Sequence, residues 1–126
     1  MKQISIKHIT NLHNDWLRGL EFYKEELQVI QKRLEDIAAR NTGHEVAENI
    51  EHFQNQLLIH ANYISEIKHS IHANLKTMQL LVQDTGGFVT EYTATQYFNL
   101  NDQYLTEEKL INELRHEFNR FAAKWM

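Results

Sequence analysis

The amino-acid sequence predicts an all-α protein, an elongated antiparallel up-down-up bundle of three helices with coiled-coil-like heptad packing. Apolar residues recur at alternating spacings of three and four over most of the chain, which is the pattern of helices that pack along one seam. Proline is absent from the 126 residues, and glycine occurs only four times. Three of the four glycines fall between the periodic segments, so we expect long helices joined by short turns.

The first predicted helix covers about residues 6–40. Its seam runs through Ile6, Ile9, His13, Trp16, Leu20, Tyr23, Leu27, Ile30, Leu34 and Ile37. The pattern stops at the segment RNTGHE, where Asn41 or Gly43 can adopt the left-handed conformation that ends a helix. Thr42, followed three residues later by Glu45, forms a capping box for the next helix, so the turn is short.

The second predicted helix covers about residues 43–84 and ends before Gly86. Its seam runs through Val46, Ile50, Phe53, Leu57, His60, Ile64, Ile67, Ile71, Asn74, Met78 and Leu81. The third covers about residues 92–125, with a seam through Tyr97, Leu100, Tyr104, Glu107, Ile111, Leu114, Phe118, Phe121 and Trp125. Short turns make consecutive helices antiparallel. We expect one domain over residues 1–126; the alternative fold is a four-helix bundle completed by a second chain.

Seven polar or amphipathic residues occupy seam positions: His13, Trp16, Tyr23, His60, Asn74, Tyr104 and Glu107. Counting outward from the two turns places His60 beside the hydroxyl of Tyr23. The same count places Glu107 beside the indole N–H of Trp16, and His13 beside Tyr104. Each pairing would satisfy a group that is costly to bury alone. We interpret these layers as residues that fix the helix register; a proton-active or ligand-binding core is the alternative.

The eight histidines raise the question of a metal site. Two segments match Glu-x-x-His, Glu66 with His69 and Glu113 with His116, which is half of the ligand set in ferritin-like di-iron bundles. The heptad frame places all four residues on the solvent side, and the two histidines at different heights. We therefore predict no metal site, no other cofactor and no catalytic residues, and keep a ferritin-like metal-binding bundle as the alternative function.

Several large apolar residues lie outside the seams. Phe22 and Val29 are seven residues apart on the first helix, as are Phe98 and Leu105 on the third. Some of these side chains belong to the flanks of the core. The other interpretation is an exposed strip of Phe22, Val29 and Ile59 that packs on a second copy of the chain, since apolar strips on soluble proteins are commonly interfaces.

Composition narrows the function classes further. The net charge of −4, with lysine and arginine spread thinly, argues against a nucleic-acid partner. No cysteine is present, which excludes disulfides and thiol chemistry. No apolar run reaches the length of a membrane span or a signal peptide, so we expect a cytoplasmic protein without a membrane partner. The prediction is a non-enzymatic protein-protein interaction or scaffold module that binds a protein partner or itself as a homodimer.

Overall fold

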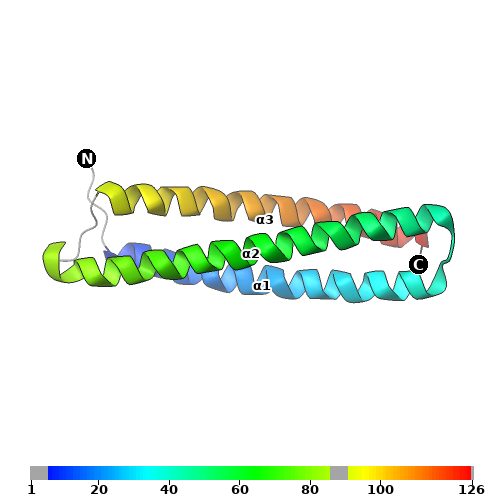
Figure 1. Cartoon of the computed structure of the whole chain (residues 1–126), viewed down its shortest axis with the longest axis horizontal. Helices are drawn as coiled ribbons and strands as arrows, with labels where there is room; N and C mark the ends of the chain where they lie inside the picture. Colours follow the sequence, from blue (N-terminus) through cyan, green and yellow to red (C-terminus); the bar gives the residue numbers. More distant parts are fainter. Residues whose placement is uncertain (1–5, 86–90, 126) are drawn as a thin grey trace.

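The computed structural model describes residues 6–85 and 91–125 and forms a three-helix bundle. The helices are α1 (Ile6–Arg40), α2 (His44–Thr85) and α3 (Glu91–Trp125). They lie side by side in a long rod, with α1 and α3 parallel and α2 antiparallel to both (Figure 1). All three pairs of helices are in contact, and the described residues contain no strand. The predicted helix limits differ from these by no more than one residue.

The core follows the predicted seams where the structure describes the side chains, which leaves out Ile6 and Leu81. The seam residues Tyr23, Ile50, Tyr104 and Trp125 are only partly buried. On α1 the buried residues include Ile9, Leu20, Leu27, Ile30, Leu34 and Ile37, with the alternating spacing that heptad packing requires. The matching positions of α2 and α3 pack against them in one cluster that runs the length of the rod. Its largest fully buried side chains, Phe53 and Phe118, meet edge to face with ring centroids 5.3 Å apart.

The connection between α1 and α2 consists of residues 41–43. Asn41 ends α1 with its side chain, because Nδ2 donates to the carbonyl of Ile37 at 2.9 Å and also approaches the carbonyl of Trp125 at 3.3 Å. Gly43 is not in the left-handed region. The Glu45 carboxylate, assigned by its sequence spacing to Thr42, accepts instead from Lys124 Nζ at 2.9 Å. The second predicted stop, Gly86, lies outside the described residues.

The register between the helices differs from the one obtained by counting from the turns. His13 contacts Asn74, three residues beyond the predicted Ile71, and His60 contacts Glu107, seven residues before the predicted Leu114. The first shift follows from side-chain direction. Side chains tilt toward the N-terminus of their own helix. In an antiparallel pair, a side chain therefore meets a residue that is a few positions later in the partner helix than backbone levels alone indicate. The second shift arises because the last turns of α2 extend beyond the first turn of α3 (Figure 1).

Gly19 allows α3 to approach α1 at the level of Tyr104. A Cβ atom at this position would overlap the Tyr104 hydroxyl. Glycine inside a helix lowers helix stability by roughly 1 kcal/mol relative to alanine. The close approach of the Tyr104 ring, which leaves no room for a side chain, explains why glycine is present here. The sequence pattern gave no role to Gly19, because its partner comes from another helix.

We expect Gly19→Ala to destabilise the bundle by about 1–3 kcal/mol, because overpacking outweighs the gain in helix propensity. Urea unfolding followed by circular dichroism measures this change. Tyr104→Phe removes the atom nearest to the new methyl group, so Gly19→Ala should cost less in that background. Equal costs in both backgrounds would contradict the proposed overlap.

Candidate functional site

The most deeply buried pair of titratable side chains is formed by His60 of α2 and Glu107 of α3. Their side chains are 6% and 4% exposed, and His60 Nδ1 is hydrogen-bonded to Glu107 Oε1. Both residues occupy seam positions, so the helices direct them toward the axis of the rod. Separating them would leave a buried imidazole or carboxylate without a partner, which is far more costly than losing an exposed ion pair.

A second polar group surrounds His13, which is completely buried. Its Nδ1 lies 2.8 Å from the carbonyl oxygen of Ile9, and its Nε2 lies 2.8 Å from Asn74 Oδ1. The Asn74 amide is in turn 3.1 Å from Gln96, whose amide reaches the Tyr92 hydroxyl at 3.0 Å. The chain of hydrogen bonds therefore starts on α1, crosses α2 and ends on α3 at an exposed phenol.

Burial lowers the pKa of His13, although its hydrogen bonds to Ile9 and Asn74 act in the opposite direction. Its ring neighbours Trp16 and Tyr97, with centroids at 4.8 and 6.0 Å, carry no charge that would offset the burial. An imidazolium donates to both oxygens, whereas the favoured neutral ring donates only to Ile9. The structure places the Asn74 oxygen Oδ1 at Nε2, so protonation of His13 adds a donor to this contact.

A third polar group lies between α1 and α3. The Tyr23 hydroxyl donates to Glu108 Oε2 at 3.0 Å. Burial, followed by Glu108, raises the pKa of Tyr23, and burial followed by the charge of Glu108 raises the pKa of Tyr104 to about 12. Both phenols therefore remain protonated donors at neutral pH. Heptad spacing did not single out Glu108, because its contact depends on which flank of α3 faces α1, and spacing within one helix does not reveal that.

The partners of the predicted polar residues are therefore not those obtained by counting. His60 meets Glu107 rather than Tyr23, Tyr23 meets Glu108, and His13 meets Asn74 rather than Tyr104. Trp16 stacks against Tyr97 and Tyr104, with centroids at 5.5 and 6.1 Å, instead of pairing with Glu107. The corrections share one cause, the register shifts described above. No buried side-chain nitrogen or oxygen of the described residues lacks a hydrogen-bond partner.

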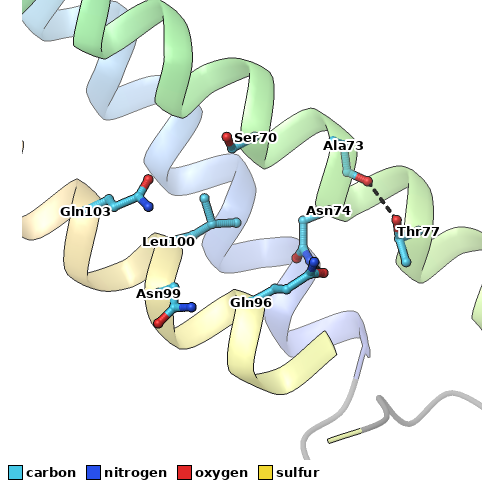
Figure 2. Close-up of a pocket in the computed structure, with 8 residues that line it drawn as sticks. All are labelled: Ser70, Ala73, Asn74, Thr77, Gln96, Asn99, Leu100 and Gln103. Carbon is cyan, nitrogen blue, oxygen red and sulfur yellow. Dashed lines mark hydrogen bonds between the residues drawn. The ribbon is translucent and has the colours of Figure 1, made fainter. Parts of the chain in front are cut away.

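A polar groove runs between α2 and α3 beside these layers. One part, with a volume of about 290 Å³, is lined mainly by amides and hydroxyls, including Asn74, Gln96 and Gln103 (Figure 2). A second part, of about 590 Å³, shares Ser70 and Gln103 with the first and contains Glu107. Both parts are open to solvent and offer hydrogen bonds without an assembled reactive group.

The histidines outside the core are distributed over the surface. His69 and His116 are exposed, as the heptad frame predicts, and His52 lies 2.9 Å from Glu117 in an exposed pair. Within residues 6–85 and 91–125, no three histidine, aspartate or glutamate side chains converge closely enough to hold a metal ion. Nor does any helix in these ranges have the length and apolar character needed to cross a membrane.

The predicted interface residues are exposed, but they lie on two sides of the rod. Phe22 and Val29 are 51% and 56% exposed, and Ile59 is 42% exposed. Glu66 and Ala73, seven and fourteen residues after Ile59, line the groove against α3, so Ile59 points toward that groove. Gly19 and Arg33 contact α3 from the side opposite the groove. Phe22 and Val29 lie next to these two residues on the surface of α1, so they belong to that opposite side. Because α3 lies between them, the three residues do not form one strip.

Phe22 and Val29 share their side of the rod with two residues of α3. Phe98 and Leu105 of α3 are 53% and 49% exposed. Each lies one helical turn before a residue on the flank that faces α1, Asn101 and Glu108 respectively. In a helix such neighbours lie on the same outer flank. We define the α1–α3 face as the side of the rod that carries Phe22, Val29, Phe98 and Leu105.

The described residues form a three-helix bundle with hydrogen-bonded polar layers inside and four exposed large apolar side chains on the α1–α3 face. No protein family, curated protein or solved structure with which the chain was compared matches it.

Replacing Glu107 by leucine should lower the free energy of unfolding by about 3–5 kcal/mol, because it leaves His60 buried without its partner. The reverse variant, His60→Leu, should have a similar effect. The double variant His60→Leu/Glu107→Leu should be within roughly 1 kcal/mol of the parent protein or more stable, since both polar groups are removed together. Urea unfolding of the four proteins measures the coupling, and additive effects would exclude a direct interaction.

The stability of the bundle should fall as the pH is lowered from 7.5 toward 5. Because the pKa of folded His13 lies below its ordinary value of 6.5, the unfolded chain binds more protons in this range. The contribution is fully present above pH 6.5 and is lost as the pH falls toward the folded pKa. His13→Gln should therefore flatten the profile of unfolding free energy against pH. An unchanged profile in that variant would rule out this role for His13.

Proposed function

We propose that the protein is a non-enzymatic helical interaction module that binds a protein partner through the α1–α3 face. The observation that carries this proposal is the exposure of four large apolar side chains on one side of the rod. Single exposed apolar residues are ordinary on soluble proteins, but an apolar patch framed by polar residues is typical of an interface.

The energy available from this face fits a reversible association. Full burial of a large apolar side chain contributes about 1.5–3 kcal/mol, so four half-exposed side chains provide roughly 3–6 kcal/mol. A micromolar complex requires about 8 kcal/mol after the cost of association. The apolar residues alone are therefore insufficient, and polar contacts around them must supply orientation and additional affinity.

The residues around the face favour a protein over a membrane or a nucleic acid. The outermost line of α1 carries Arg18, Glu25 and Lys32, whose charges alternate. A phosphate-rich surface would be matched by a uniformly basic rim. Alternating charges are suited to a partner that presents side chains of both signs.

The buried polar layers support a structural rather than a catalytic role. His60 and Glu107 are bonded to each other, and His13 is enclosed by its hydrogen bonds and aromatic neighbours. A general acid or base must reach a substrate atom within hydrogen-bond distance. These groups are directed toward one another, so the proposed function relies on the outer surface.

A photo-crosslinking phenylalanine analogue at position 105 should give a covalent adduct in the cells that produce the protein. The same probe at Ile59, which replaces a similarly exposed apolar residue on the other side of α3, is the matched control. We expect an adduct from position 105 that Val29→Glu diminishes, and at most a weak one from position 59. Absence of any adduct from position 105 would refute the α1–α3 face as a binding surface.

A further inference from the structure

We propose that acidification opens one end of the rod, at the layer of His13, while the opposite end stays packed. The His13 end is the end at which α1 and α3 start (Figure 1), and it consists of residues 6–20, 67–80 and 91–104. The Phe53 end consists of residues 27–40, 44–57 and 111–125. This pH-sensitive device lies inside the bundle and is independent of the α1–α3 face. Two features carry the inference: the uneven distribution of buried polar groups along the rod, and the uncharged surroundings of the His13 imidazole.

Buried polar groups are confined to one part of the rod. Within the described residues they are His13, Asn74, Thr93, His60 and Glu107. The first three belong to the His13 end, and the pair of His60 with Glu107 marks its inner limit. Every buried residue of the Phe53 end is hydrophobic, and its aromatic rings pack against one another. The two ends therefore hold together by different interactions, and segments of this kind open with different free energies.

A groove brings solvent close to the His13 layer. Asn74 contacts the imidazole Nε2 at 2.8 Å and also lines the groove of about 290 Å³ between α2 and α3 (Figure 2). Gln96, from the other wall of this groove, is hydrogen-bonded to Asn74 at 3.1 Å. One amide side chain thus separates the imidazole from solvent, and water that enters the layer can take over the hydrogen bonds of both amides. Separation of the helices at this layer therefore leads directly to hydration of His13.

No charged side chain of the described residues compensates an imidazolium at position 13. On α1 the ring is surrounded by the indole of Trp16 and the carbonyl of Ile9, while the nearby carboxylate of Asp15 is exposed and binds an arginine of the same helix. On α2 it meets the uncharged amide of Asn74. The carbonyl and amide oxygens accept hydrogen bonds, but they do not replace the hydration of a full charge.

The third helix, α3, presents the ring of Tyr97, which is stacked on His13 with centroids 6.0 Å apart. Burial raises the pKa of Tyr97, so its phenol stays neutral in acid. Burial also lowers the pKa of His13 in the closed rod, whereas the hydrated imidazole of an opened end has its ordinary pKa of 6.5. The opened end therefore binds the proton more tightly. Acidification from pH 7.5 to 5.5 should raise the equilibrium constant for opening by up to about tenfold.

Opening replaces a closed surface by an apolar one. Ile9, Ile71 and Met78 are completely buried in the closed rod. They become accessible when α1 separates from α2 and α3 at the His13 end, while the Phe53 end keeps the three helices together. An acidic environment therefore presents an apolar seam that can pack against another amphipathic helix.

Native-state amide hydrogen exchange of the full chain, followed by NMR at pH 7.5 and 5.5, tests the proposal. Dividing the intrinsic exchange rate at each pH by the observed rate gives protection factors, which measure opening at each amide. We expect amides of residues 9–17 and 71–78 to be at least about tenfold less protected than those of residues 30–37 and 111–118. Between pH 7.5 and 5.5 their protection should fall about five- to tenfold, while the Phe53 end remains the better protected end at both pH values.

Two variants assign the effect to His13. His13→Gln removes the titratable group, so the protection of the His13 end should be the same within about twofold at the two pH values. Asn74→Asp places a carboxylate at Nε2, which stabilises the imidazolium in the closed rod, so the fall in protection should disappear or reverse. His72→Gln is the matched control, because His72 is an exposed histidine of the same end, and it should retain the full effect of pH. Circular dichroism establishes that each variant is helical.

Equal protection of both ends would mean that the rod opens only as a whole, which would overturn the proposal. Unequal protection that does not change with pH would exclude His13 from the opening. A fall in protection that either His13→Gln or Asn74→Asp retains would exclude it as well. None of these outcomes bears on the α1–α3 face, which the crosslinking experiment tests separately.

Discussion

The hydrogen bond between His60 and Glu107 fixes the height of α3 against α2, and much of the remaining structure depends on that height. An aliphatic seam repeats every seven residues, so one heptad of the seam packs against another with little difference in energy. A buried imidazole and carboxylate remove this freedom, because any slip leaves both groups without a partner in the core. The contact of His13 with Asn74 has the same effect between α1 and α2.

The register in turn determines what the outer surface presents. With α1 and α3 offset by 85 residues, Tyr104 lies against Gly19 and Glu108 accepts from Tyr23. In these contacts two protonated phenols and one carboxylate fill the space between α1 and α3. The same offset places Leu105 close in height to Phe22 on the outside. The interior contacts and the proposed interface are therefore two consequences of one alignment.

Local physics explains which parts of this structure could be predicted from the sequence. Heptad spacing and turn residues are properties of each segment, so the three helices and their seams follow within about one residue of the observed limits. Pairings such as His60 with Glu107 depend on side-chain tilt and on how far α2 extends beyond α3, which spacing within one helix does not reveal. The misplacement of Ile59 has a further cause. The seam identifies the inward side of a helix, but the handedness of the bundle decides which neighbour each flank faces.

The interior of the bundle and its outer surface differ in how well their groups are matched: buried polar atoms have hydrogen-bond partners, whereas several large apolar side chains remain exposed to solvent. Inside the described bundle, buried polar atoms have partners and the aromatic rings of Trp16, Tyr97 and Tyr104 pack against one another. Fold stability therefore makes no use of the exposed halves of Phe22, Val29, Phe98 and Leu105. Exposed apolar area of this kind favours association, and the two pairs at seven-residue spacing lie on facing flanks of parallel helices. Their common orientation is explained most simply by a surface that they cover together.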